Sequence, residues 1–300
     1  MSGALWALAA GAGFGIFQSL NRQAVRGMDV YVATFVQLAV STVVLVTISL
    51  LTEDVSLIFN APVTTIINFA AAGFLHFLIG WTLLNASQKK IGASRTSPLI
   101  GTTPLFAAVI AVFTLREYPT WLELVGIAII VTGAYLVSRE SADPSLANNR
   151  KQSFMSILQA SWLGLGTAFF WALSPIFIRF GLQGLPSPLL GVTVGVTASA
   201  LGYGVVLLWQ RGRWLGQPIT NEAWILKLVA GVLVGLSTWM RWVALDLAPV
   251  AVVLALSMIS TPIVILLSPL ISGKHIERVT AMLWAGTGLI LGGALLLIFI

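Results

Sequence analysis

Residues 117–133 read EYPTWLELVGIAIIVTG, and residues 277–293 read ERVTAMLWAGTGLILGG. Each stretch has a glutamate, a glycine nine residues later and a second glycine seven residues after the first. The two copies are 160 residues apart, and further pairs recur at 157 or 158 residues: Arg22 with Arg179, Gly27 with Gly184, Gly73 with Gly231, Trp81 with Trp239 and Pro104 with Pro262. The repeated spacing predicts two copies of one structural unit within the chain.

The composition indicates that both copies lie in a membrane. Of the 300 residues, 58% are hydrophobic and only 9% are charged, and the mean hydropathy is +0.96. Soluble domains carry about 25% charged residues. The formal charge of +6 fits basic residues at the ends of membrane helices better than a nucleic-acid surface. Because the chain has no cysteine, disulfides and thiolate metal sites are excluded.

Ten apolar runs match the roughly 20 residues that a helix needs to cross a bilayer core of about 30 Å. We predict membrane helices at Ala4–Leu20, Tyr31–Leu51, Val63–Ala86, Ala93–Leu115, Trp121–Val137, Ile157–Phe180, Pro188–Trp209, Ala223–Leu245, Val250–Ile271 and Thr280–Phe299. Five helices per copy is an odd number, so the second copy must enter the membrane from the opposite side. We therefore expect an all-α integral membrane protein of ten transmembrane helices, in two inverted five-helix repeats around a central cavity. The first run has no positive segment before it and is interpreted as a retained helix rather than a signal peptide.

The boundaries and the orientation follow from the polar residues. The repeats are predicted at residues 1–138 and 157–300, joined by a polar linker at 139–156. Thirteen of the 16 Lys and Arg residues fall on the side reached after the first, third, fifth, seventh and ninth helices. Because basic loops stay in the cytoplasm, this bias predicts that both termini face away from it. We expect a multi-pass protein of a bacterial inner membrane.

Acidic residues and histidines are too few for several other functions. Around the predicted spans, acids occur only near helix ends, at Glu117, Glu123 and Asp246. A multidrug or cation exporter that works by exchange typically needs a carboxylate inside the membrane, so this alternative is disfavoured. The two histidines, His76 and His275, form no HExxH or other metal motif. We expect no enzyme activity, no cofactor and no bound metal.

Several predicted helices carry side chains that form a candidate substrate site. The proposed contacts are Gln18, His76, Trp81, Thr103, Trp239 and Arg241. Arg241 either grips a carboxylate or phosphate in the cavity or reaches the interface and pairs with Asp246. His76 either contacts substrate or bonds to a neighbouring helix. The two tryptophans occupy matching places in the repeats, where they form cavity walls or fill the packing between the halves.

Two prolines at matching places are candidates for helix breaks with a gating role. They occur as Thr103-Pro104 and Thr261-Pro262. A proline inside a helix removes a backbone hydrogen bond, and paired breaks in a transporter point to a central site. The alternative is a simple kink whose free carbonyls are satisfied by nearby Thr or Ser hydroxyls.

Other repeated residues are interpreted as architecture. Glu117 and Glu277 precede the fifth and tenth helices, and a helix N-terminus favours negative charge. Glycine pairs with the spacing G-x-x-x-G recur in the first, seventh, eighth and tenth spans, and this spacing lets helices approach closely. Such pairs pack neighbours within a ten-helix chain and do not establish an oligomer; a monomer is compatible with the pattern.

Together, the repeat, the ten spans and the glutamate–glycine signature resemble the drug/metabolite transporter superfamily, and in particular its ten-helix EamA-type branch. The most specific pieces are Leu115-Arg116-Glu117 with Gly126 and Gly133, and the two Thr-Pro pairs. The resemblance implies two inverted halves around a cavity that opens alternately to each side. It also implies movement of small metabolites without ATP hydrolysis.

Two features depart from this family pattern. Many relatives keep charged termini in the cytoplasm, whereas residues 1–21 and 279–300 carry no charge. The stretch Gly101-Thr102-Thr103 lacks the large aromatic residues expected in an exporter of aromatic amino acids, so a smaller or more polar substrate is expected.

We therefore predict a secondary transporter that works by alternating access on a small metabolite, amino acids or similar zwitterionic or anionic solutes first. Its expected partners are this solute and membrane lipid. The alternatives are a multidrug or cation exporter of the same fold and a non-transporting membrane scaffold or sensor.

Overall fold

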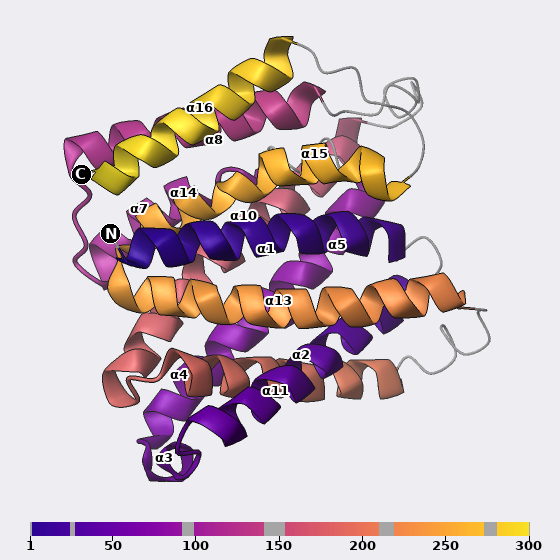
Figure 1. Cartoon of the computed structure of the whole chain (residues 1–300), viewed down its shortest axis with the longest axis vertical. Coiled ribbons are helices and arrows are strands. Elements are labelled where there is room, and N and C mark those ends of the chain that lie inside the picture. Colours follow the sequence, from indigo (N-terminus) through magenta and orange to yellow (C-terminus); the bar gives the residue numbers. More distant parts are fainter. Residues whose placement is uncertain are drawn as a thin grey trace.

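A computed structural model describes residues 2–24, 28–91, 99–140, 154–209, 219–272 and 281–299. This part of the chain is almost entirely helical and contains no strand (Figure 1). The α-helices are α1 (Ser2–Ala24), α2 (Val30–Thr52), α3 (Ser56–Asn60), α4 (Val63–Gly73), α5 (Trp81–Ile91), α7 (Thr103–Thr114), α8 (Trp121–Glu140), α10 (Phe154–Gly184), α11 (Pro188–Trp209), α13 (Asn221–Leu247), α14 (Val250–Leu256), α15 (Ser260–Ser272) and α16 (Ala281–Phe299). A π-helical segment, η1 (Phe74–Gly80), joins α4 to α5, and a 3₁₀ turn, η2 (Ser257–Ile259), joins α14 to α15.

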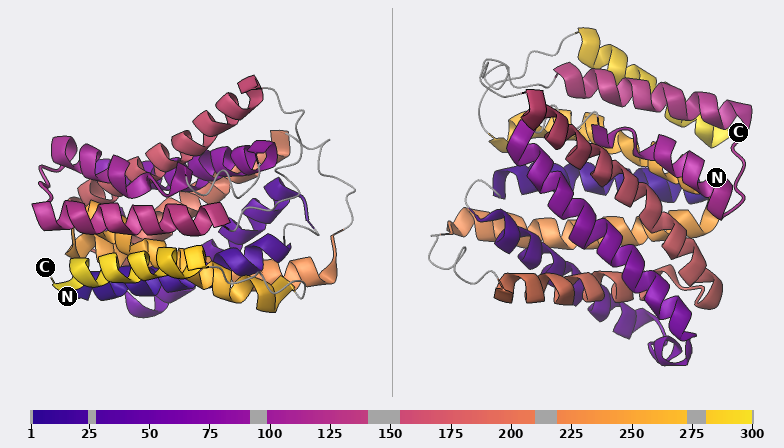
Figure 2. Two further views of the ribbon diagram at one scale, coloured as in Figure 1. Left: turned by 90° about the horizontal axis from the view of Figure 1, so that it is seen from above. Right: turned by 180° about the vertical axis from the view of Figure 1, so that it is seen from behind.

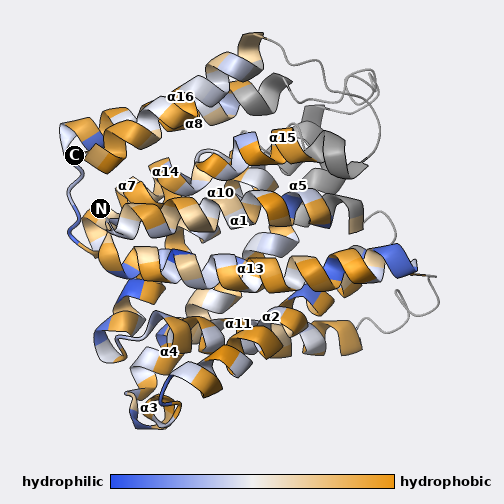
Figure 3. Cartoon of the chain, in the orientation of Figure 1, coloured by the Kyte–Doolittle hydropathy of each residue, from blue (hydrophilic) through white to orange (hydrophobic). Residues whose placement is uncertain are grey.

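Helices that suit a membrane occur in all ten predicted regions. Six are long and apolar enough to cross it: Ser2–Asn21, Tyr31–Thr52, Val63–Leu84, Trp162–Gly184, Pro188–Trp209 and Asn221–Leu247. Four shorter apolar helices occupy the other regions: Thr103–Thr114, Trp121–Leu136, Val250–Val264 and Trp284–Phe299. Hydrophobic colour covers most of the ribbon in Figure 3, and large apolar side chains such as Phe59, Phe113 and Trp209 are exposed. Such a surface fits lipid as the solvent, so the expected all-helical membrane protein is confirmed.

Many of the helices run roughly side by side across the bundle (Figure 1), with their ends at its two opposite sides. The N- and C-terminal ends of the chain lie near each other at one of these ends in both views of Figure 2. The predicted linker is described only in part. α8 and α10 extend into its two ends, and residues 141–153 lie outside the described residues.

Contacts between the two halves come in equivalent pairs. Helix α1 of the first half packs along α13 of the second half. Its counterpart α10, of the second half, packs along α4, η1 and α5 of the first half. Likewise α2 packs on α13, whereas α11 packs on α4. Two further contacts join equivalent helices to each other, α2 with α11 and α8 with α16. These contacts therefore recur with the roles of the two halves exchanged.

The glycines of the repeated motif make the close contact between α8 and α16. A Cβ built on Gly133 would lie 2.6 Å from the carbonyl oxygen of Gly286, and one built on Gly293 would lie 3.0 Å from that of Gly126. A side chain at either place would push the backbones apart, so close packing explains the glycines. The glycines at this seven-residue spacing thus allow α8 and α16, the last helices of the two halves, to pack closely.

Both Thr-Pro pairs lie just after an interruption of a helix. Residues 101–102 form a turn before α7, and Pro104 lies in the first turn of α7. In the second half η2 interrupts the helix, and Pro262 lies in the first turn of α15. The first N–H groups of a helix have no partner within it, so a proline there removes no interior hydrogen bond. Both prolines therefore follow an interruption of regular α-helix, and their gating role stays a prediction.

The start of α8 also differs from the prediction for Glu117. Thr120 and Glu123 form a capping box, in which the Thr120 hydroxyl accepts the Glu123 N–H at 3.2 Å. The Glu123 carboxylate in turn accepts the Thr120 N–H at 2.7 Å. Glu117 therefore does not cap the helix that follows it.

Candidate functional site

An arginine–histidine pair from the two halves lies inside the bundle. Nη2 of Arg241, on α13, is 2.9 Å from Nε2 of His76, in η1. Because a guanidinium only donates hydrogen bonds, Nε2 of His76 accepts and the ring proton resides on Nδ1. Arg241 thus turns to a histidine of another helix, while Asp246, the alternative partner, is exposed.

Aromatic rings contact both members of this pair. The guanidinium carbon of Arg241 is 4.9 Å from the ring centre of Phe14 on α1, a cation–π contact. The imidazole of His76 stacks on Trp171 of α10, with ring centres 5.2 Å apart and planes 19° apart. Phe14 and Trp171 are 157 residues apart, the spacing that relates α1 to α10. Equivalent aromatic rings of the two halves therefore contact the pair: Phe14 contacts Arg241, and Trp171 contacts His76.

The backbone of η1 positions His76. Phe74–Gly80 is π-helical within a segment that is otherwise α-helical, and π segments are rare and frequent at functional sites. Nε1 of Trp171 donates to the carbonyl of His76 at 3.1 Å. A Cβ on Gly80 would lie 2.5 Å from this Nε1, so the glycine lets the indole approach. The indole holds both the backbone and the ring of His76.

Three buried nitrogens of this cluster have no hydrogen-bond partner within the described part of the chain: Nδ1 of His76, Nε of Arg241 and Nε1 of Trp81. Trp81 joins the cluster through Trp171, with ring centres 6.3 Å apart, and through Phe17, at 5.5 Å. With the proton of His76 on Nδ1, all three nitrogens are N–H donors. A buried donor without an acceptor costs about 1–3 kcal/mol. A carboxylate or phosphate, rich in acceptor oxygens, is the kind of group that such a cluster binds.

Within the described part of the chain, the other predicted contacts form no hydrogen bond to Arg241 or His76. Gln18 is exposed on α1. Trp239 packs against Trp6, with ring centres 6.3 Å apart. Thr103 is buried, and its hydroxyl donates to the carbonyl of Ile100 at 2.6 Å, a local bond at the start of α7. Among the described side chains, no group of three or more His, Asp and Glu could hold a metal ion.

Comparison with known proteins finds a family similar to the first part of the chain. The profile of the EamA-like transporter family matches residues 1–139. Residues 1–139 are thus similar to EamA-like transporters. A solved structure described only as "Crystal structure of protein" matches 97% of this chain and 97% of its own, with a TM-score of 0.73 and 13% identity. At this identity the match shows a shared fold alone. No curated protein matches the chain significantly.

An ion pair connects the EamA-like half to the second half at one end of the bundle. Oε1 of Glu117 is 2.6 Å from Nη2 of Arg179. Oε2 of Glu117 accepts the N–H of Val250, the first residue of α14, at 2.9 Å. Arg179 also donates to the carbonyl of Leu245 at 2.7 Å. The glutamate of the motif therefore stabilises the N-terminus of a helix in the opposite half.

A buried lysine was missed by sequence reasoning. Lys227 of α13 is 1% exposed, and its ammonium donates to Oε1 of Gln37 at 2.7 Å and to Oδ1 of Asn21. A lysine this close to the start of a span is expected to reach the interface, so the sequence pattern does not indicate that Lys227 is buried. The repeat carries the missed signal, because the equivalent position in the EamA-like half is Phe69, a buried aromatic residue.

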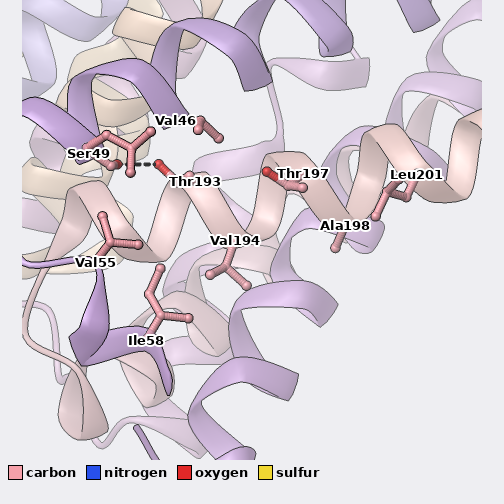
Figure 4. Close-up of a pocket in the computed structure, with 10 residues that line it drawn as sticks. Val46, Ser49, Val55, Ile58, Thr193, Val194, Thr197, Ala198 and Leu201 are labelled. Carbon is pink, nitrogen blue, oxygen red and sulfur yellow. Dashed lines mark hydrogen bonds between the residues drawn. The ribbon is translucent and has the colours of Figure 1, made fainter. Parts of the chain in front are cut away.

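A pocket of about 350 Å³ lies between α2, α3 and α11 (Figure 4) and shares no lining residue with the arginine–histidine cluster. Val, Leu, Ile and Ala side chains form most of its wall, with hydroxyls from Ser49, Thr193 and Thr197. The hydroxyls of Ser49 and Thr193 bond to each other at 2.9 Å. No charged side chain lines this pocket, so it lacks the chemistry that binds an anion.

Proposed function

We propose that this chain is a secondary transporter for a small metabolite that bears a carboxylate or another anionic group, with amino acids as the first candidates. The observation that carries the proposal is the Arg241–His76 pair with its unpartnered N–H donors. A bound carboxylate would give these donors acceptors and so offset the cost of burying them. Gln18, Thr103 and Trp239 remain proposed as outer contacts of the same site.

The contacts between the halves support alternating access. The exchange of roles in these contacts and the paired helix interruptions before Pro104 and Pro262 favour two inverted five-helix repeats, residues 1–138 and 157–300. In such transporters the substrate binds between the repeats, and rocking of one against the other exposes it to each side in turn. Because Arg241 and His76 come from different halves, that movement would open and close the proposed site.

The same observations weigh against the alternatives. A multidrug or cation exporter needs a carboxylate at its site, whereas this cluster presents a guanidinium. A scaffold or sensor gains nothing from unpartnered donors in its interior, which only lower its stability. The proposal contains no catalytic step and no cofactor.

Flux into proteoliposomes tests the proposed function. The purified protein is reconstituted and screened for exchange of amino acids, other carboxylates, phosphate esters and organic cations. We expect exchange of at least one carboxylate-bearing solute and competition from other carboxylates. Exchange of organic cations alone, or of no solute in the panel, would contradict the proposal.

The variant that tests the site is Arg241→Ala. Since a hydrogen bond to a charged group contributes about 1.5–3 kcal/mol, we expect kcat/KM for the carboxylate to fall by roughly 10- to 100-fold. Arg241→Lys should recover only part of this loss, because an ammonium lacks the planar fork of a guanidinium. Phe113→Leu, at an exposed apolar position of α7, serves as the control. Unchanged affinity and rate in Arg241→Ala would rule out the anion contact.

For the cell, we propose a monomer in a bacterial inner membrane with both termini outside the cytoplasm. The distribution of basic residues supports this orientation. Fusion of alkaline phosphatase or green fluorescent protein to the C-terminus tests it. Phosphatase activity without fluorescence is the expected result, and a fluorescent fusion would reverse the orientation.

A further inference from the structure

Lys227 lies inside the bundle without a carboxylate beside it. It belongs to the membrane-spanning helix Asn221–Leu247, six residues or about 9 Å from its start. Of the carboxylates that the structure describes, none is within ion-pairing distance of Lys227. A buried ammonium without a counter-charge is costly, so this residue calls for a reason beyond packing.

The side chain does not reach out to the interface. Met28, Ala33 and Ala223 belong to an apolar cluster, and Ala223 lies one helical turn before Lys227 on the same face of α13. Ala33 precedes Gln37 by one turn on α2 in the same way. Lys227 is therefore held at the depth of Gln37, behind apolar side chains.

The hydrogen bonds at Lys227 suit a group that changes its protonation state. Two side-chain oxygens accept from Nζ, one from Gln37 and one from Asn21. An ammonium has three N–H donors, whereas the neutral amine has two. Loss of one proton therefore leaves both bonds in place, and the contacts among α1, α2 and α13 survive it.

Other titratable and charged groups on the helices packed around α13 have different partners or positions. They are Arg22 on α1, whose side chain lies outside the described residues, Asp29, Tyr31 and Glu53 on or beside α2, Glu222, Arg241 and Asp246 on α13 itself, Tyr203 on α11 and Arg179 on α10. Asp29 caps α2 by accepting the N–H groups of Tyr31 and Val32. None of the described groups in this set is hydrogen-bonded to Lys227.

We propose that Lys227 is a proton-carrying site that couples transport to a pH gradient, an inference that rests on the transporter function proposed above. In one conformation the ammonium releases one proton to water on one side of the membrane. In the other conformation the amine takes up one proton from water on the opposite side. Only an N–H bond forms or breaks in this cycle, so it needs no further reactant.

Two kinds of flux measured on one preparation test this role. A carboxylate identified by the solute panel is followed in exchange at equal pH on both sides and in accumulation driven by an imposed pH difference. The unmodified protein should show both activities. Lys227→Met should keep exchange but lose accumulation, so that its accumulation ratio equals the ratio measured without a gradient.

A second variant separates proton transfer from a structural tie. Lys227→Arg keeps a cation and its donors, but a guanidinium does not release its proton in proteins. The proton-carrying role predicts that Lys227→Arg loses the response to the gradient, whereas a purely structural tie predicts that it keeps the response. Ser41→Ala, which removes the neighbouring bond to the Gly231 carbonyl, is the matched control and should keep the response.

The outcomes distinguish this inference from the function on which it rests. A Lys227→Arg variant that responds to the gradient like the unmodified protein would overturn the role of Lys227. If the unmodified protein exchanges the solute but shows no accumulation driven by the pH difference, the role of Lys227 is overturned as well. The transporter function is not affected by that result. Absence of exchange for every solute would instead refute the transporter function itself.

Discussion

Equivalent segments of the two halves build two junctions that are filled differently. Where α13 meets α1 and α2, Lys227 faces Gln37. Where α4 meets α10 and α11, the positions 158 residues away hold Phe69 and Gly195. The central side chains are equally buried, with 1% of Lys227 and 0% of Phe69 exposed. Equivalent helices therefore pack around an ammonium in one place and around a benzene ring in the other.

The room for the ring comes from glycines. A Cβ on Gly181 would lie 2.3 Å from the Phe69 ring, and one on Gly191 would lie 2.8 Å from it. The equivalent positions at the other junction are Ala24 and Ala33. Because an apolar residue suffices to join the helices at one junction, packing alone does not require a lysine at the other.

The largest effect is expected at the apolar junction. Phe69→Ala leaves a cavity between helices that cannot fully collapse, and should lower the free energy of unfolding by about 3–5 kcal/mol. Titration with sodium dodecyl sulfate in detergent micelles measures this loss, with Phe69→Leu as the milder control. A loss of less than about 1 kcal/mol would mean that the ring does not hold this junction together.

A smaller effect should separate Gly73 from its equivalent, Gly231. A Cβ on Gly73 would lie 2.1 Å from the carbonyl oxygen of Gly195, which is backbone. A Cβ on Gly231 would first meet the Cβ of Val40 at 2.7 Å, a less severe overlap. Overpacking costs roughly 1–3 kcal/mol, and Gly73→Ala should fall at the upper end and Gly231→Ala at the lower. Equal losses of unfolding free energy in the same titration would show that both junctions accommodate an added methyl group equally well.

The smallest effect concerns two equivalent serines. Ser41 donates across the junction to the carbonyl of Gly231 at 2.7 Å, whereas Ser199 donates at 2.7 Å to Gly195 of its own helix. Ser41→Ala should therefore cost about 1 kcal/mol. Ser199→Ala should cost only a few tenths of that (about 0.3 kcal/mol), because a serine bond to its own helix adds little. A larger loss for Ser199 in paired unfolding measurements would reverse this assignment.

Features that depend on nearby residues could be predicted from the sequence, and those that depend on distant ones could not. Hydropathy located the ten apolar regions, since each is a continuous run of residues. It could not find the turn at residues 101–102, because that turn lies within such a run, and so Pro104 was placed inside a helix. The role of Glu117 was missed because its partner Val250 lies in the opposite half.

The same limit applies to the candidate site. Arg241 and His76 could be singled out because charged and polar residues are rare inside apolar runs. Their contact could not be predicted, and neither could the rings of Phe14 and Trp171, since an aromatic residue is equally suited to lipid. The burial of Lys227 could not be predicted, because its two hydrogen-bond acceptors come from two other helices.

The partners of Glu117 are synthesised long after Glu117 itself. The N–H that it accepts belongs to a residue made 133 positions later. While the second half is still on the ribosome, neither that group nor the guanidinium of Arg179 has been placed beside the carboxylate. A charged carboxylate without partners is costly in lipid, so the segment between α7 and α8 has to wait in water at the membrane surface. Its bond to α14 forms only after most of the second half has been inserted, and the arrival of α14 is what allows this end of the bundle to close.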